Sequence, residues 1–158
     1  GGTRDASVAV EGGVLRSTAD WEDRCALGRA PLLGACGRSA KAAWKLAVRG
    51  LPADGWFTAG VIGNASPADE SFRDPSCFTW AANGSAWQAG ASTGGAGGWQ
   101  GWAQGDVAVF ELDPSARALR MFHRRTKQVY AMDVAGDCAQ ARVHFNFGVA
   151  GTEVEVSQ

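Results

Sequence analysis

The residues that could do chemistry are few, and none stands in a complete catalytic pattern. Residues 90–94 read G-A-S-T-G and match the G-x-S-x-G nucleophile motif, but Gly and Ala follow them where that motif needs a helix. Glu111 and Asp113 place two carboxylates on one face of a predicted strand, without the second catalytic acid that glycoside hydrolysis requires. We therefore interpret the first as a chance match and the second as a solvated strand end that leads into the turn at Asp113-Pro114, and we predict that the protein is not an enzyme.

Histidine and cysteine form no metal-site pattern. His123 and His144 are the only imidazoles, and neither has a second ligand-type residue at i+2 or i+4. We expect His144 at the sheet surface, and no metal and no cofactor. The four cysteines are far apart and include no C-x-x-C pair, so we expect reduced and mostly buried thiols, with one or two disulfides as the alternative: Cys25, Cys36, Cys77 and Cys138.

The charge balance disfavours two classes of partner. Fifteen Lys and Arg against 16 Asp and Glu give a net charge of -1, so no overall field favours nucleic acid or an anionic membrane. Residues 123–127 form a local basic cluster, which we interpret as a solvated turn or, alternatively, as a rim for an acidic partner. No apolar run is long enough to span a bilayer and no export signal opens the chain, so we predict a cytoplasmic protein.

The elements that must position these residues are strands. Short period-two alternation, broken by Gly, Pro, Asn and Asp, recurs along the chain and is typical of antiparallel strands with one buried face. In residues 43–49 it places Trp44, Leu46 and Val48 on one face. About ten such strands without βαβ alternation predict an all-β fold, a β-sandwich of two antiparallel sheets in a jelly-roll arrangement. We expect a single domain over residues 1–158, excised from a longer protein.

Three segments depart from the strand pattern. Residues 18–27 could hold a short helix that Gly28 stops, and residues 64–76 form a long loop. Residues 90–105 contain seven glycines and predict a surface loop, with Trp99 and Trp102 packed onto the sandwich. Exposed apolar residues in loops often mark a protein-binding surface, and the candidates are Leu32 with Leu33 and Trp99 with Trp102.

The order of these motifs resembles the SPRY domain, a β-sandwich recognition module. Residues 43–48 are similar to its tryptophan-centred strand, residues 56–61 to its W-x-x-G-V strand, and residues 105–113 to its G-D-V-x-x-x-x-L-D strand. Residues 118–122 and 151–156 resemble a later hairpin and the last strand. Arg124-Arg125-Thr126 replaces the usual Asn-Gly turn, Val143-His144-Phe145 replaces a common Pro-Ala-Val segment, and no PRY segment is evident.

The resemblance implies a concanavalin-like sandwich that binds a protein or short peptide without catalysis. Residues 78–87 resemble the adaptor branch, whose members serve as substrate receptors of ubiquitin ligases, and the other segments leave the subfamily open. In that branch three segments build a rim on which the peptide docks, with an aromatic anchor as the main contact. Carried over to this sequence, the rim residues are Arg29, Pro31, Leu32 and Arg38, then Phe78, Trp80 and Asn83, and last Val149, Ala150 and Gly151.

Other functions stay open at this stage. A two-sheet sandwich can also be a lectin, in which Trp99 or Trp102 would stack on a sugar ring. Calcium would then be held by loop carboxylates, and the candidates are Asp69, Glu70 and Asp74. A degenerate hydrolase and a purely structural role are two further alternatives.

Overall fold

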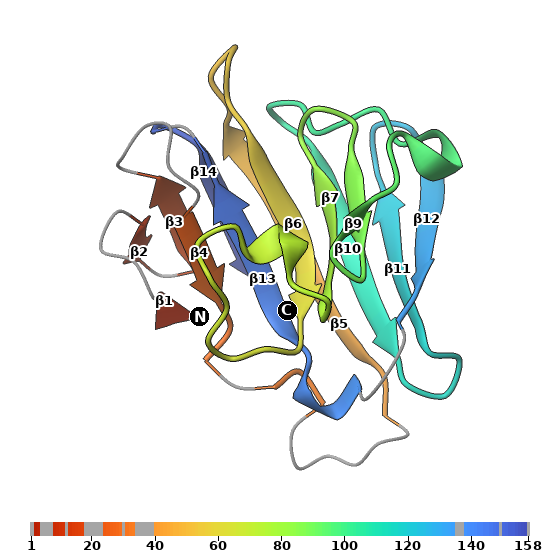
Figure 1. Cartoon of the computed structure of the whole chain (residues 1–158). Helices are drawn as coiled ribbons and strands as arrows, with labels where there is room; N and C mark the ends of the chain where they lie inside the picture. The colour runs from red at the N-terminus through yellow and green to blue at the C-terminus, as the bar shows by residue number, and fades with distance from the viewer. Residues whose placement is uncertain are drawn as a thin grey trace.

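The protein folds as two antiparallel sheets that lie face to face. The computed structural model describes residues 2–3, 8–11, 13–17, 24–29, 31–33, 40–134, 138–148 and 150–157. In spatial order sheet A consists of β1 (Gly2–Thr3), β4 (Arg24–Leu27), β13 (Arg142–Phe147), β6 (Phe57–Ile62), β7 (Cys77–Ala81), β8 (Ala86–Gln88) and β9 (Ala91–Ser92). Sheet B consists of β12 (Gln128–Asp133), β11 (Ala118–His123), β10 (Val107–Asp113), β5 (Ala42–Gly50), β14 (Glu153–Ser157), β3 (Val14–Ser17) and β2 (Val8–Glu11). This confirms the predicted all-β sandwich (Figure 1).

The described residues contain fourteen strands rather than about ten, together with three short 3-10 helices. These helices are η2 (Ser71–Arg73), η3 (Ala96–Gly98) and η4 (Cys138–Gln140). The helix expected over residues 18–27 is wrong for its second half, because residues 24–27 form β4. That strand pairs with β13, which matches Leu27 to His144 and Ala26 to Phe145. Residues 18–23 lie outside the described part of the chain.

The core lies between the sheets and follows the predicted alternation. Trp44, Leu46 and Val48 of β5 are buried, and the Trp44 ring stacks on Phe110 of β10 with centroids 5.2 Å apart. Trp44 is therefore a core residue, as predicted. All six residues of β6 are buried because the outer face of sheet A is covered as well. We call the end of the sandwich at which β6 begins the upper end, and the end at which β6 finishes the lower end, as they lie in Figure 1.

The glycine-rich segment packs as predicted, and its two tryptophans are core rather than exposed. Trp99 and Trp102 are buried, and their indole N–H groups donate to the carbonyls of Ala81 and Trp80 at 2.8 and 2.9 Å. Gly101 allows this approach, since it has a φ of +109° and a Cβ there would lie 2.1 Å from the Ala82 carbonyl oxygen. The expectation of exposed apolar loop residues is therefore wrong for both tryptophans and for Leu33, which is buried too.

A loop between β6 and β7 covers the outer face of sheet A. Figure 1 shows it crossing in front of the sheet, with η2 over β6 and β13. Beneath it the outward-facing residues of β13, His144 and Asn146, are completely buried. The expectation that His144 lies at the sheet surface is therefore wrong. Alternation does point it away from the core, but the loop closes over it.

Candidate functional site

The structure does not bring the three predicted rim segments together. The first lies at the lower end, where the Gly28 N–H donates to Val143 and the Leu32 N–H to Ala141. Asn83 of the second segment and the described residues of the third lie at the upper end, about 20 Å away along β13, whereas Phe78 pairs with Val61 near the lower end of β6. The lower group is Arg29, Pro31 and Leu32, and the upper group is Asn83, Ala150 and Gly151. Arg38 and Val149 lie outside the described residues.

Two of the predicted contact residues are core residues. Phe78 and Trp80 are each 2% exposed, because alternation in β7 points both between the sheets. Trp80 packs there against Phe110, with ring centroids 6.0 Å apart. Neither side chain can serve as an exposed anchor in this conformation, so this part of the prediction is corrected. Asn83, in the turn after β7, is exposed and accepts the Ser85 N–H in its own turn.

The lower end holds a cavity of about 590 Å³ between the sheets. Its walls come from the inner faces of β3, β4, β5, β13 and β14 and are mostly apolar, and its inner lining includes Leu15, Ala26, Leu33, Trp44, Phe145 and Val156. Arg29, Pro31 and Leu32, the three described residues of the first rim segment, line it as well. Exposed Arg29, Lys41 and Ser157 mark where the cavity reaches the surface. This size and lining suit a ligand with one bulky apolar group.

The mouth of the cavity is held by a few polar contacts. The Arg142 guanidinium donates to the carbonyls of Gly28 and Arg29 at 3.3 and 2.6 Å, which fixes the loop that carries Arg29. Lys41 lies 3.8 Å from Glu111 and 3.7 Å from Asp113, so its charge is partly compensated. The Arg29 side chain stays exposed and has no such partner among the described residues, and it is therefore the cation most available to a ligand.

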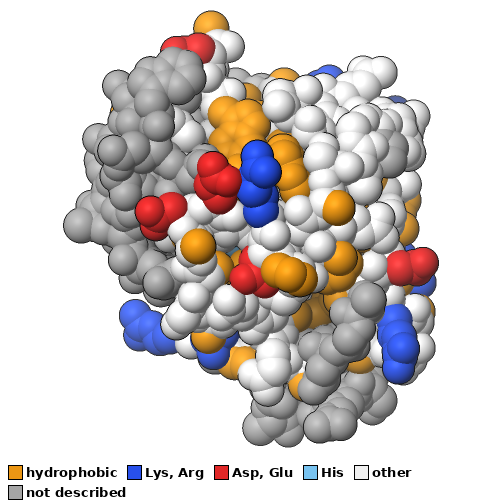
Figure 2. Space-filling view, in the orientation of Figure 1, with side chains coloured by type: hydrophobic (Ala, Val, Ile, Leu, Met, Phe, Trp, Pro, Cys, Tyr) orange, Lys and Arg blue, Asp and Glu red, His pale blue; other side chains and the backbone are white. Residues whose placement is uncertain are grey.

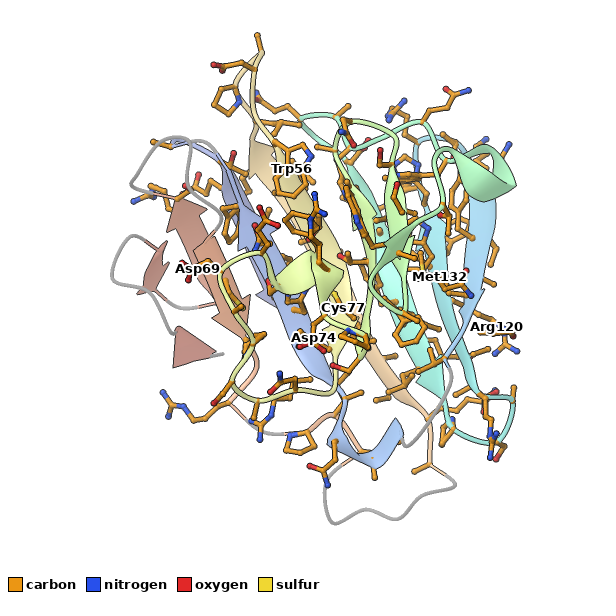
Figure 3. The ribbon with its side chains drawn as sticks, viewed as in Figure 1. Trp56, Asp69, Asp74, Cys77, Arg120 and Met132 are labelled. Carbon is orange, nitrogen blue, oxygen red and sulfur yellow. The ribbon has the colours of Figure 1, made fainter. Side chains whose placement is uncertain are left out.

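An aromatic patch lies on the outer face of sheet A at the upper end. Trp56, Phe72 and Trp87 meet edge to face or tilted, with centroids between 4.8 and 6.3 Å apart. Trp56 and Trp87 are partly exposed, and Arg73 lies over the Phe72 ring while it pairs with Glu70 at 2.8 Å. Figure 2 shows hydrophobic side chains near the top of this face with a basic and an acidic group beside them, and Figure 3 places Trp56 there. The sequence pattern does not indicate this patch, because its three residues are far apart along the chain.

A buried polar cluster lies under the loop between β6 and β7. The Ser71 hydroxyl is 2.7 Å from His144 Nε2 and accepts from the Asn146 amide at 2.8 Å, and Cys77 Sγ is 3.6 Å from His144 Nδ1. Burial lowers the pKa of His144 to about 3, against the opposing pull of Asp74, so the ring is a neutral base at physiological pH. Burial also raises the pKa of the Cys77 thiol. Serine beside neutral histidine resembles a nucleophile and its base, but both are fully buried, so the pair is closed to a substrate here.

The second histidine belongs to a charged cluster at the upper end. Asp106 accepts from Arg125 Nε at 2.7 Å, from His123 Nε2 at 2.9 Å and from the Ala103 N–H at 2.8 Å. Burial works against ionisation of this carboxyl, but these hydrogen bonds outweigh it and lower the pKa of Asp106. In the G-D-V segment of this chain, the aspartate ties the start of β10 to the turn after β11. The interpretation of residues 123–127 as a solvated turn therefore holds for exposed Arg124 and Lys127 but not for His123.

The residues proposed for a lectin site do not assemble one. Trp99 and Trp102 are buried, as described above, and cannot stack on a sugar. Glu70 pairs with Arg73, while Asp74 accepts hydrogen bonds from Ser76 and Asn64. Partial burial of the Asp74 carboxyl disfavours its ionised form, but these hydrogen bonds outweigh burial and lower the pKa of Asp74. Within the described ranges no three His, Cys, Asp or Glu side chains converge as a metal site.

Comparison with known proteins rests on structure alone. No family model and no curated protein matches the sequence. The fold matches the crystal structure of the SPRY domain of human HERC1 with a TM-score of 0.73, at 17% identity, over 96% of this chain and 92% of that one. The chain has the fold of a SPRY domain. A second human SPRY domain matches with a TM-score of 0.62 at 15% identity over 95% and 94% of the two chains, and the TRIM65 PSpry domain with 0.64 at 12% over 99% and 88%.

The SPRY fold explains the motif order seen in the sequence. The tryptophan-centred segment is β5, the W-x-x-G-V segment is β6, and the G-D-V segment leads into β10. Each lies at or next to the centre of its sheet, where both neighbours restrict the side chains. Across the part of the chain that is described, no helix has the length and apolar character needed to cross a bilayer.

Proposed function

We propose that this domain with the SPRY fold is a non-catalytic protein-interaction module that binds a short peptide at the lower cavity. The observation that carries the proposal is a cavity of about 590 Å³ with both apolar and polar lining, to which Arg29, Pro31 and Leu32 contribute. A bulky apolar side chain of the peptide enters the cavity, and Arg29 binds a carboxylate or backbone carbonyl beside it. Binding sites of this kind take their free energy from one or two buried anchors and their orientation from a few polar groups at the rim.

A peptide display library of random 12-residue sequences tests this proposal. We expect peptides selected on the wild-type domain to share a large apolar residue, and their affinity to fall at least tenfold with Leu32→Ser or Arg29→Glu. Asn83→Ala, at the opposite end, is the matched control and should leave affinity unchanged. Far-UV circular dichroism confirms that each variant is folded. Equal binding to Leu32→Ser and wild type, or loss of binding with Asn83→Ala alone, would exclude the lower cavity and favour the upper group.

We also infer a cellular role from the resemblance to the adaptor branch. In this role the module is the substrate receptor of a larger cytoplasmic protein. The protein that contains the bound peptide is then the substrate to which ubiquitin is transferred. Ubiquitin-ligase subunits should co-purify with the full-length protein, and their absence from it would contradict this role while leaving peptide binding intact.

A further inference from the structure

Three large hydrophobic side chains stand out as exposed in the described part of the molecule. Val109 is 42% exposed, Phe122 43% and Val129 62%. They come from three strands that lie side by side in Figure 1, namely β10, β11 and β12. Scattered exposed hydrophobics need no explanation, but these three are cross-strand neighbours. Register pairs Val109 with Phe122 and Phe122 with Val129.

These three residues, which we call the apolar row, face away from the core. The residues next to them along each strand, Phe110, His123 and Tyr130, are buried between the sheets. Alternation therefore places the row on the outer face of sheet B. Adjacent strands lie about 4.8 Å apart, so the row extends about 10 Å across the sheet. That length matches the separation of residues i and i+7 on one side of an α-helix, about 10.5 Å at 1.5 Å per residue.

Three exposed cations lie at two edges of the apolar row, one on β5 and two in the turn between β11 and β12. Lys45 of β5 is directly opposite Val109 in the register, Arg124 follows Phe122 by two residues, and Lys127 precedes Val129 by two. All three are exposed, and none forms an ion pair with another residue that the structure describes.

The neighbouring charges on this sheet behave differently. Arg49 pairs with Glu155, and Arg120 pairs with Glu111 at 3.3 Å. On β12 the exposed acid is Asp133, at the lower end of the strand, four residues beyond Val129. The surface around the apolar row is therefore locally basic although the chain carries a net charge of -1.

We propose that the apolar row and its three cations form a second interaction surface, which binds an acidic amphipathic helix of a partner protein. Apolar side chains at i, i+3 or i+4, and i+7 of that helix cover Val109, Phe122 and Val129. Its acidic side chains pair with Lys45, Arg124 and Lys127, which gives the surface charge complementarity. This inference is independent of the proposed function, because the row lies on the outer face of sheet B and the cavity lies between the sheets.

A display library of helical peptides with one randomised face tests the second surface. We expect selection on the wild-type domain, with subtraction on Phe122→Ser, to recover helices that combine an i, i+3 or i+4, i+7 apolar pattern with flanking Asp or Glu. Their affinity should fall at least tenfold with Phe122→Ser and with Lys45→Glu. It should also weaken as salt rises, since exposed ion pairs are screened. Leu32→Ser, at the cavity, should leave it unchanged.

Four results would overturn the inference. One is a set of selected helices without acidic enrichment, and another is equal binding to Phe122→Ser and wild type. A third is concentration-dependent self-association in sedimentation that Phe122→Ser abolishes, because a second copy would then be the occupant. The fourth is co-sedimentation with anionic vesicles that is lost in Phe122→Ser without any helix selected, which would assign the surface to a membrane. The effect of Leu32→Ser is measured with the cavity-binding peptides and that of Phe122→Ser with the helical peptides, so the two proposals can fail independently.

Discussion

The two histidines lie in buried polar clusters that differ in charge. His123 at the upper end contacts ionised Asp106, which also binds Arg125. His144, under the loop on sheet A, contacts only neutral groups, the Ser71 hydroxyl and the Cys77 thiol. The charged cluster ties strand ends together, whereas the neutral cluster holds a loop against a sheet. The same residue type therefore stabilises the fold by attraction in one place and by neutral hydrogen bonds in the other.

Removing the carboxylate of the charged cluster should have the largest effect on stability. Asp106→Ala leaves buried His123 Nε2 and the Ala103 N–H without this acceptor, and it removes the carboxylate that pairs with Arg125. We expect the free energy of unfolding to fall by roughly 3 kcal/mol, the lower part of the range for breaking a buried ion pair, because half of the Arg125 side chain is exposed and can be hydrated. Urea unfolding followed by tryptophan fluorescence measures this change.

The control for the charged cluster is an aspartate in the same sheet with no such partners. Asp133→Ala removes an exposed carboxylate from β12 and should change the free energy of unfolding by less than about 0.5 kcal/mol. If Asp106→Ala were no more costly than Asp133→Ala, the charged cluster would not hold the upper end together.

The sequence predicted the fold well because strand alternation and the central motifs are local signals. Residues 43–49 show the inner face of β5 directly, and the G-D-V segment marks the start of β10. Residues 24–27 form a strand where the sequence predicts part of a helix, since four residues carry too little periodicity to separate helix from strand. Pairing with β13 decides that element, and this pairing is not visible from residues 24–27 alone.

The candidate site was predictable only in part. Arg29, Pro31 and Leu32 do line a cavity, but Phe78 looked like an anchor because its segment resembles the adaptor branch, and burial depends on which way β7 faces. His144 was misplaced for a related reason. Alternation predicts the outward face of a strand correctly, but whether a distant loop covers that face is a tertiary property.

Removing the hydroxyl of the neutral cluster should have the second-largest effect. Ser71→Ala leaves His144 Nε2 buried without its partner, while the Asn146 amide keeps the Asp69 carbonyl at 2.8 Å. We expect a loss of about 2 kcal/mol, the ordinary cost of one buried group left unpaired. Because Ser71 connects the loop to the sheet, trypsin should also cut after exposed Arg73 faster than in the wild type.

Ser66→Ala is the matched control for this loop, since Ser66 is exposed and lies in the same segment. It should leave both the free energy of unfolding and the trypsin cleavage rate near the wild-type values. A Ser71→Ala protein that loses stability but keeps the wild-type cleavage rate would show that the hydroxyl supports the sheet and does not hold the loop.

The smallest expected effect is a pH dependence that the neutral cluster should produce. Burial lowers the pKa of His144 to about 3, whereas an unfolded histidine titrates near 6.5. Between these values the unfolded chain binds a proton that the folded chain does not, so stability is full above pH 6.5 and falls as the pH is lowered. The expected slope between pH 6 and pH 5, where most carboxyls stay ionised, is about 1.2 kcal/mol per pH unit. His144→Gln keeps a side chain that can bond Ser71 but cannot titrate, and it should flatten this slope in urea unfolding at each pH. An unchanged slope in His144→Gln would assign the acid sensitivity to another group.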